Sequence, residues 1–122
     1  MAGRSPSRRR GIAPSVNPRV RFEDEADAEY RLAGRYYEER REHLGIEFFD
    51  AVDATIDHIL ELPRAGTLVR RMPADLPVRR RAVPRFPYYV IYLEAGTDLR
   101  ILAIAHDRRK PGYWKDRLKH SQ

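Results

Sequence analysis

The segment from Val78 to Arg117 constrains the fold of this chain more than any other part. It contains three strand-like blocks, VRRRAV, YYVIYL and LRILAIA, and closes with a histidine, a basic run and an aromatic pair. Successive side chains of a β-strand point to opposite faces, so the apolar residues can bury one face of a sheet while arginines occupy the other. We therefore expect an arginine-bearing face that meets an anionic partner, either a phosphate backbone or an acidic protein.

Charge is distributed unevenly along the 122 residues. Residues 1–21 carry six arginines and no acid, residues 22–62 carry four basic and thirteen acidic side chains, and residues 63–122 carry fourteen basic and five acidic ones. The excess of nine acids in the second stretch cancels the excess of nine bases in the third, so the net charge of +6 equals the charge of residues 1–21. This asymmetry indicates a charged partner on one face of the folded body.

The acidic half of the chain predicts two helices. Asp24 is expected to cap the first helix, whose apolar residues recur at three- and four-residue steps, and Gly45 is expected to end it. The second helix follows at once and stops before Pro63. So short a link makes the pair an antiparallel hairpin. The aromatic pairs Tyr36-Tyr37 and Phe48-Phe49 are expected in the core.

Strand patterns lie before and after the helices, at Val20–Phe22, Leu68–Met72, Val78–Val83, Tyr88–Leu93 and Leu99–Ala105. The fourth of these is nearly continuous apolar and aromatic sequence, which is typical of a central strand. The order β-α-α-β-β-β-β predicts an α+β fold, with the helical hairpin packed on one face of a small, largely antiparallel sheet.

The length is sufficient for one folded domain, which we assign to residues 19–118, with residues 119–122 as a C-terminal tail. Residues 1–18 combine four arginines with three prolines and three serines and lack apolar periodicity, so we expect a disordered basic tail. Mitochondrial transit peptides share this arginine- and serine-rich composition, but they carry an apolar stripe that is missing here. No apolar run approaches the ~18 residues of a membrane span. The absence of cysteine fits a reducing, cytoplasmic location.

Several kinds of chemistry can be excluded from the residue types. The chain has no glycine-rich phosphate loop. It has no cysteine, and none of its four histidines pairs with another at helical ligand spacing, so we expect no metal and no cofactor. Serine occurs only at positions 5, 7, 15 and 121, in the two tails, which excludes a serine hydrolase.

After these exclusions, the one feature left that could carry chemistry is a basic sheet with a histidine at the end of its last strand. By the two-residue period, Arg100, Leu102, Ile104 and His106 are expected to share one face of the last strand. A metal-independent ribonuclease needs few further groups, because RNA supplies its own 2′-hydroxyl nucleophile, a histidine or tyrosine moves protons, and arginines stabilise the charge on the phosphate. The candidates for this set are His106, Arg79, Arg81, Arg85 and Tyr113.

Each candidate also has a structural interpretation. His106 can cap a turn or pair with Asp107, and the arginines can contact an acidic partner. Tyr113 and Trp114 can pack the C-terminal segment against the sheet. The residue types by themselves leave the catalytic and the structural interpretations open.

Four blocks of the sequence resemble the RelE/ParE family of bacterial type II toxins: VRFEDEADAEYRLAGRYYEE, GIEFFDAVDATIDHILELP, RRRAVPRFPYYVIY and ILAIAHDRRKPGYWKDR. The resemblance runs from about Val20 to Arg117, and the spacing of the last two blocks is its most specific part. It implies a toxin of the plasmid-stabilisation type, held inactive by a cognate antitoxin that wraps a partly helical, acidic segment around it.

The resemblance implies one of two targets. RelE-like members cut mRNA on the ribosome, whereas ParE-like members act on DNA gyrase without cleaving nucleic acid. The RFPYY block and the HDRRKPGYW ending are closer to ParE-like sequences, and residues 68–93 lack the lysines or the glutamate that the nuclease branch places on its middle strands. We therefore expect action on gyrase, with a ribosome-dependent mRNA endonuclease or an inactive basic binding module as alternatives.

The resemblance carries over to single residues only in part. His106 matches a histidine that recurs at this strand end in both branches, whereas Arg81 and Arg85 match basic positions that help to bind phosphate in the nuclease branch. For contact with the antitoxin or the target we expect Arg79, Arg81, Arg100, Arg108, Arg109 and Trp114.

Overall fold

The computed structural model describes residues 17–120, without the side chain of His120. The elements follow in the order β1 (Val20–Phe22), α1 (Asp24–Arg40), α2 (Leu44–Glu61), β2 (Thr67–Leu68), β3 (Arg79–Ala82), β4 (Tyr88–Ala95), β5 (Asp98–His106) and a closing 3₁₀ helix, η2 (Lys115–His120). The five strands form one sheet in the order β1-β5-β4-β3-β2. All pairs are antiparallel except β1 with β5. The predicted α+β fold is confirmed.

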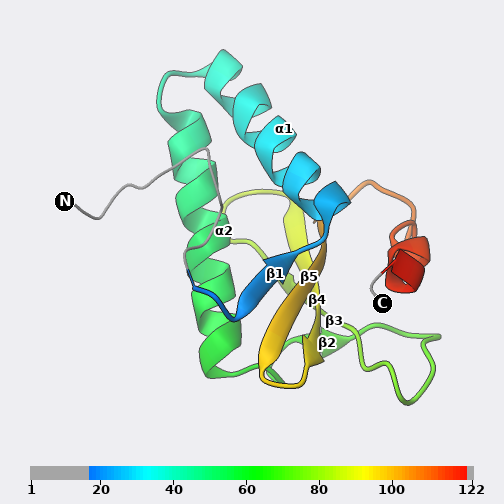
Figure 1. Ribbon diagram of the computed structural model, residues 1–122. Coiled ribbons are helices and arrows are strands. Elements are labelled where there is room, and N and C mark those ends of the chain that lie inside the picture. The colour runs from blue at the N-terminus through cyan, green and yellow to red at the C-terminus, as the bar shows by residue number, and fades with distance from the viewer. Residues whose placement is uncertain (1–16, 121–122) are drawn as a thin grey trace.

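The two helices form an antiparallel hairpin on one face of the sheet (Figure 1). Acidic residues occupy the first turn of α1, where they complement the positive end of the helix dipole. The residue that flanks the start of this helix is Glu23 and not Asp24, so the predicted cap is displaced by one residue.

The junction between the helices differs from the prediction. The first helix ends at Arg40, and Gly45 lies in the first turn of α2 instead of ending α1. A Cβ atom at Gly45 would lie 2.6 Å from the carbonyl oxygen of Gly34, so the glycine is needed for the close approach of the two helices. The left-handed residue of the connection is His43, with a φ of 73°. The carboxylate of Glu38 accepts hydrogen bonds from the backbone N–H groups of His43 and Gly45, at 3.0 Å each, and so caps the second helix.

A β-bulge interrupts the long hairpin of β4 and β5. Ile91 lies opposite Ala103 and Tyr92 lies opposite Ile101, which leaves Leu102 as the extra residue. The two-residue period is therefore broken at this point. Residues before the bulge keep the expected face, but Ile104 and His106 move to the opposite one, so the predicted shared face of Arg100, Leu102, Ile104 and His106 is wrong.

Apolar side chains cover both faces of the sheet. One core lies between the sheet and the helices and includes Tyr30, Phe48, Val90 and Ile104. The second core lies on the other face and contains Val78, Ile91, Leu93, Leu102, Ala103, Ala105 and Trp114. The segment between β2 and β3 and the segment around η2 pack against it through Val69, Met72, Leu76, Tyr113 and Leu118. The expected open, arginine-bearing face is thus filled by apolar side chains.

Smaller differences also concern predicted elements. The strand expected at Leu68–Met72 is only the two residues Thr67–Leu68. Tyr36, expected in the core, is 48% exposed. The predicted disordered tail lies outside the described residues except for Asn17 and Pro18, whereas η2 extends through Lys119 and His120, which were expected in the C-terminal tail. Between residues 17 and 120, no helix is long and apolar enough to cross a membrane.

Candidate functional site

His106 ends β5 on the face of the sheet that carries the helices. Its ring packs edge-on against Tyr88, the residue opposite it on β4, with 5.0 Å between the ring centroids. The Nδ1 atom accepts a hydrogen bond from the backbone N–H of Arg108 at 3.1 Å and lies 3.2 Å from a carboxylate oxygen of Asp107. In the neutral ring the hydrogen bond that Nδ1 accepts from Arg108 places the proton on Nε2. With its side chain 35% exposed, His106 can present that N–H group to a partner.

A row of aromatic rings leads away from this histidine. Tyr88 contacts Tyr37 and Phe48, and Tyr37 in turn contacts Tyr36. Burial raises the pKa of Tyr88 to about 12, and burial likewise raises the pKa of Tyr37. Both phenols therefore stay protonated at neutral pH, so they can donate hydrogen bonds but cannot act as bases.

Three arginines extend this surface toward the edge of the sheet. Arg79 and Arg81 lie on the helix-facing side of β3, because they pair with Tyr92 and Val90, which belong to the core under the helices. The Nη1 atom of Arg79 donates to the carbonyl of Gly66 at 2.8 Å. The Nη1 atom of Arg81 is buried and has no hydrogen-bond partner within residues 17–120.

The third of these, Arg85, lies in the turn between β3 and β4, in the left-handed region with a φ of 73°. Its Nη2 atom donates to Glu47 on α2 at 2.8 Å, and its guanidinium group lies over the ring of Phe86. The hydrogen bond from Arg85 lowers the pKa of Glu47, so the carboxylate stays charged and keeps this arginine engaged.

Tyr113 occupies a different part of the molecule. Its hydroxyl donates to Glu29 on α1 at 2.7 Å, and the guanidinium groups of Arg109 and Arg117 lie over its ring, 3.8 and 5.0 Å from the ring centroid. Burial, followed by the hydrogen bond to Glu29, raises the pKa of Tyr113 far above its ordinary value. Arg117 makes two hydrogen bonds to the same carboxylate, at 2.9 Å each. Tyr113 and Arg117 thus hold the C-terminal segment against α1 through Glu29.

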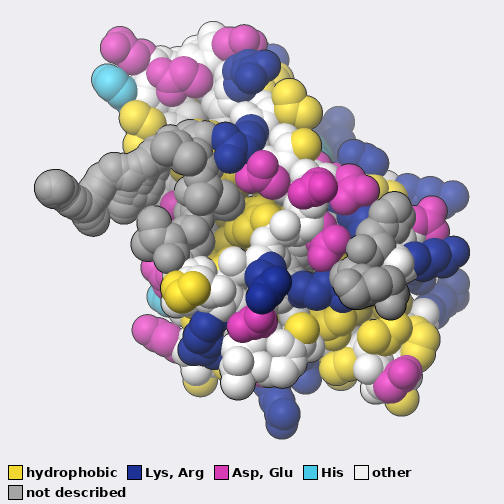
Figure 2. Space-filling view, viewed as in Figure 1, with side chains coloured by type: hydrophobic (Ala, Val, Ile, Leu, Met, Phe, Trp, Pro, Cys, Tyr) yellow, Lys and Arg dark blue, Asp and Glu magenta, His cyan; other side chains and the backbone are white. Residues whose placement is uncertain are grey.

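The remaining predicted contact residues divide into buried and exposed ones. Trp114 is 3% exposed and packs in the second core, and Arg100 pairs with Glu23 at 2.9 Å with its side chain 13% exposed. Arg108 and Arg109 are exposed in the turn that follows β5. Figure 2 shows basic side chains gathered on the side of the molecule where this turn leads into the C-terminal segment.

The structure therefore brings only part of the predicted set together. His106 and Arg81 lie on the same face of the sheet, on β5 and β3 with β4 between them. Arg85 is held by Glu47, and Tyr113 is held by Glu29. Sequence reasoning missed Tyr88 and Tyr37, because the bulge that places His106 opposite Tyr88 leaves no pattern in the residue types. Glu29 and Glu47 could not be told apart from the other acids of the helices.

Comparison with known proteins identifies the class that this fold and surface define. Residues 20–111 match the family described as the ParE toxin of type II toxin-antitoxin systems. Because the match spans most of the chain, the protein belongs to this family.

The fold also resembles a solved structure, the chromosomal ParDE toxin-antitoxin system from P. aeruginosa. The TM-score is 0.59, and the match covers 71% of this chain and 92% of that chain. The two sequences are 15% identical, so this likeness establishes the fold only. A search of curated proteins found no match.

Proposed function

We propose that this protein is the toxic component of a type II toxin-antitoxin system, that a cognate antitoxin neutralises it in the cytoplasm, and that DNA gyrase is its target. Membership of the ParE family supports the toxin and the antitoxin partner. The similar solved structure is described as a ParDE toxin-antitoxin system, which agrees with that pairing. The choice of target depends on the site.

The observation that favours gyrase over RNA is the position of Tyr113. A tyrosine that moves protons in RNA cleavage must have its hydroxyl free to reach the reacting phosphate. Here the hydroxyl is bound to Glu29, and its raised pKa keeps the proton in place. Arg85 is likewise engaged with Glu47. Two groups that cleavage of RNA would use are thus already bonded within the protein, which supports action by binding.

One observation favours the alternative, a ribosome-dependent mRNA endonuclease. His106 is partly exposed, and Arg81, which shares its face of the sheet, has a buried nitrogen without a partner among the described residues. Arg81 as a whole is half-buried, so the rest of its guanidinium group could donate to a phosphate oxygen. One experiment, described next, distinguishes gyrase from mRNA as the target.

The test is induction of the protein alone in a bacterial host, followed within minutes by mapping of mRNA ends and by a supercoiling assay of purified gyrase with the protein. We expect intact mRNA, filamentous cells and reduced supercoiling, and rescue by the product of a reading frame next to the toxin gene. His106→Ala is compared with His58→Ala, a change at an exposed histidine of α2. Codon-phased mRNA cleavage that is lost in His106→Ala and kept in His58→Ala would establish the nuclease instead.

A further inference from the structure

The turn that follows β5 carries three consecutive cations. Arg108, Arg109 and Lys110 are all exposed, and none of them forms an ion pair with an acid of residues 17–120. The acid of this turn, Asp107, lies against the Nδ1 atom of His106. The backbone of the turn is held in place, because the N–H of Arg109 donates to the carbonyl of His106 at 3.0 Å. The turn therefore presents an excess of positive charge at a fixed position.

One side of α1 continues this surface. Four residues of the helix recur at steps of three and four and so share that side: Glu29, Leu32, Tyr36 and Arg40. The side faces the C-terminal segment, because Glu29 accepts the hydrogen bond from Tyr113. Tyr36 is 48% exposed, and the guanidinium group of Arg40 lies over its ring, 4.5 Å from the centroid. The helix thus adds a fourth cation on the side that faces the turn.

The aromatic rings beside these cations already contact other groups. Arg40 lies over Tyr36, which also packs edge-on against Tyr37, and Arg109 lies over the ring of Tyr113. Proteins that bind single-stranded nucleic acid stack its bases on exposed aromatic faces. Here the surface offers cations for phosphates but no open ring as a platform for bases. This combination favours the backbone of a duplex over single-stranded RNA.

An exposed basic turn can also serve solubility alone or meet an acidic protein. Solubility needs no fixed side chains, whereas the ring contacts restrict Arg40 and Arg109 before any partner binds and so lower the entropy cost of binding. A protein interface has an apolar centre with few charges. On α1, Leu32 is the one large aliphatic residue that is exposed. The surface therefore fits a row of phosphates better than it fits a protein.

We propose that the turn of residues 107–110 and the adjoining side of α1 bind the phosphate backbone of duplex DNA without reading its sequence. The three cations of the turn would meet phosphates, Arg40 would add a further contact, and the Nε2–H of His106 would donate to a phosphate oxygen. Contact with DNA needs no gyrase, so this binding goes beyond the proposed function. Only the choice of duplex, the one that gyrase holds, rests on that function.

The contact is tested by an anisotropy titration of a fluorescein-labelled duplex of arbitrary sequence with the whole 122-residue chain. Each phosphate contact releases counterions, which gives the plot of log affinity against log salt a slope of about −0.9 per contact. The double variant Arg108→Ala/Lys110→Ala should therefore make this slope shallower by about two. Its affinity for the duplex should be at least about tenfold lower at roughly 100 mM salt.

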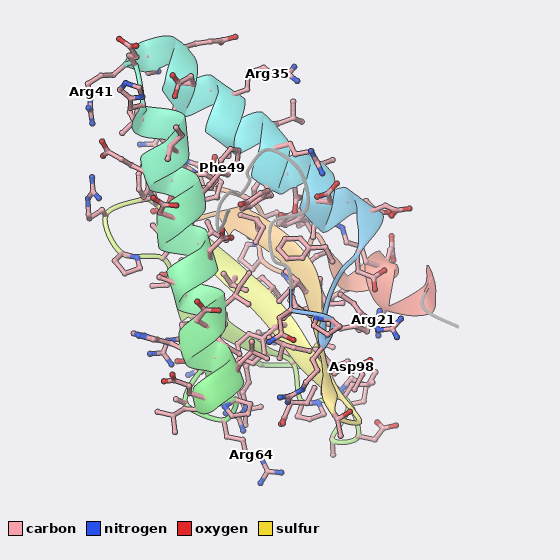
Figure 3. The ribbon with its side chains drawn as sticks, turned by 60° about the vertical axis from the view of Figure 1, so that its left-hand side comes forward. Arg21, Arg35, Arg41, Phe49, Arg64 and Asp98 are labelled. Atoms are coloured by element: carbon pink, nitrogen blue, oxygen red, sulfur yellow. The ribbon has the colours of Figure 1, made fainter. Side chains whose placement is uncertain are left out.

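The matched control is Arg21→Ala/Arg64→Ala, which removes the same charge far from the turn. These arginines are 70% and 83% exposed, and they pair with Asp98 and Glu94 (Figure 3). Asp98 begins the strand that the turn follows, so the control residues lie at its other end. All three proteins keep the arginines of residues 1–16, so any binding by those is the same in each. The control should lower affinity less than about threefold, because salt screens distant charges.

Several results would overturn the DNA-binding surface. Equal losses in the two double variants would show that binding follows net charge and not this turn. Tighter binding of single-stranded RNA than of the duplex would assign the surface to RNA. Unchanged DNA affinity of Arg108→Ala/Lys110→Ala, with lost inhibition of gyrase supercoiling, would assign the turn to contact with an acidic protein.

The proposed function and the DNA-binding surface can fail separately. If the original chain inhibits gyrase but does not bind the duplex, the surface is overturned and the toxin assignment stands. If the original chain binds the duplex as expected but does not inhibit gyrase, the proposed target is contradicted and the surface stands.

Discussion

Glu29 connects three parts of the molecule through one carboxylate. It accepts hydrogen bonds from the hydroxyl of Tyr113, from the guanidinium group of Arg117 and from the backbone N–H of Ile104. Arg117 also donates to the carbonyl of Leu102. Beyond Ile101, no strand of the described chain lies on the outer side of β5, because β1 turns into the helix there. These two side chains therefore satisfy the backbone groups that β1 would otherwise bond.

Glu29→Gln tests this role. The carboxylate and Arg117 are 17% and 13% exposed, and breaking a largely buried pair leaves a charge without its partner, so we expect a loss of about 3 kcal/mol in the free energy of unfolding. The pKa of Tyr113 should fall in the variant but stay above its ordinary value, because burial is the larger cause of the shift. Denaturant titration and ultraviolet titration of the phenol measure the two effects.

The control is Asp27→Asn on the same helix, which breaks the more exposed pair with Arg31 and removes one acid from the first turn, and should cost less than about 1.5 kcal/mol. Equal losses in the two variants would show that Glu29 is an ordinary surface acid.

A substitution at Ile91 tests how tightly the second core is packed. It lies on β4, is 4% exposed, and packs with Leu93, Leu102 and Trp114 on the face of the sheet away from the helices. Ile91→Ala should lower the free energy of unfolding by about 2–5 kcal/mol, because it leaves a cavity among buried side chains. Denaturant unfolding measures the change. A loss below about 1 kcal/mol would mean that this core is loosely packed.

At the scale of elements, the helical hairpin depends on two glycines that face each other. A Cβ atom at Gly45 would meet the carbonyl oxygen of Gly34, and one at Gly34 would meet the ring of Phe49. In an unconstrained helix, replacing glycine by alanine stabilises by about 1 kcal/mol. In Gly45→Ala the clash should reverse the sign, with a net loss of about 1–3 kcal/mol.

Thermal unfolding of Gly45→Ala beside Gly96→Ala gives the comparison. Gly96 has open space around it but a φ of 64°, so its substitution should also cost stability, by backbone strain and not by a clash. A stabilised Gly45→Ala would show that the helices can separate without loss.

The sequence predicted the elements better than their contacts. Alternation in VRRRAV and the apolar run YYVIYL identified two strands, since period and composition follow directly from the pleat. Gly45 was misplaced because a glycine after a helical pattern fits a helix end as well as a close helix contact. The second core was missed because Val69, Met72 and Leu76 lie in a segment without periodicity. Which residues of the candidate site contact each other depends on the bulge, which the residue types do not indicate.

At the scale of the whole molecule, buried tyrosines make stability depend on pH at the alkaline end. Burial raises the pKa of Tyr30, Tyr88 and Tyr113 above the ordinary value of 10.0. The folded protein holds these protons at a pH where the unfolded chain releases them. Their contribution to stability is therefore fully present below about pH 10 and is lost as the pH rises above it.

Tyr30, which is 1% exposed, should account for a slope of up to ~1.4 kcal/mol per pH unit, and the two less buried tyrosines should add smaller amounts. Denaturant unfolding at pH 9, 10 and 11 (roughly one step below and one above the phenol's ordinary range) measures the slope. Tyr30→Phe should make it shallower. A free energy of unfolding that does not change through this interval would show that folding does not raise the pKa of these tyrosines.

The extra residue at Leu102 has a consequence for comparing this protein with its relatives. On a strand with a bulge, an insertion or deletion of one residue moves every later side chain to the other face of the sheet. Two related chains can therefore have the same residue type at aligned positions that face opposite sides. A relative that lacks this residue would need its histidine one position away in the sequence to occupy the same place in space. Sequence alignments of such toxins should therefore carry a one-residue gap before the histidine, and scoring conservation column by column without it would compare residues that face opposite sides of the sheet.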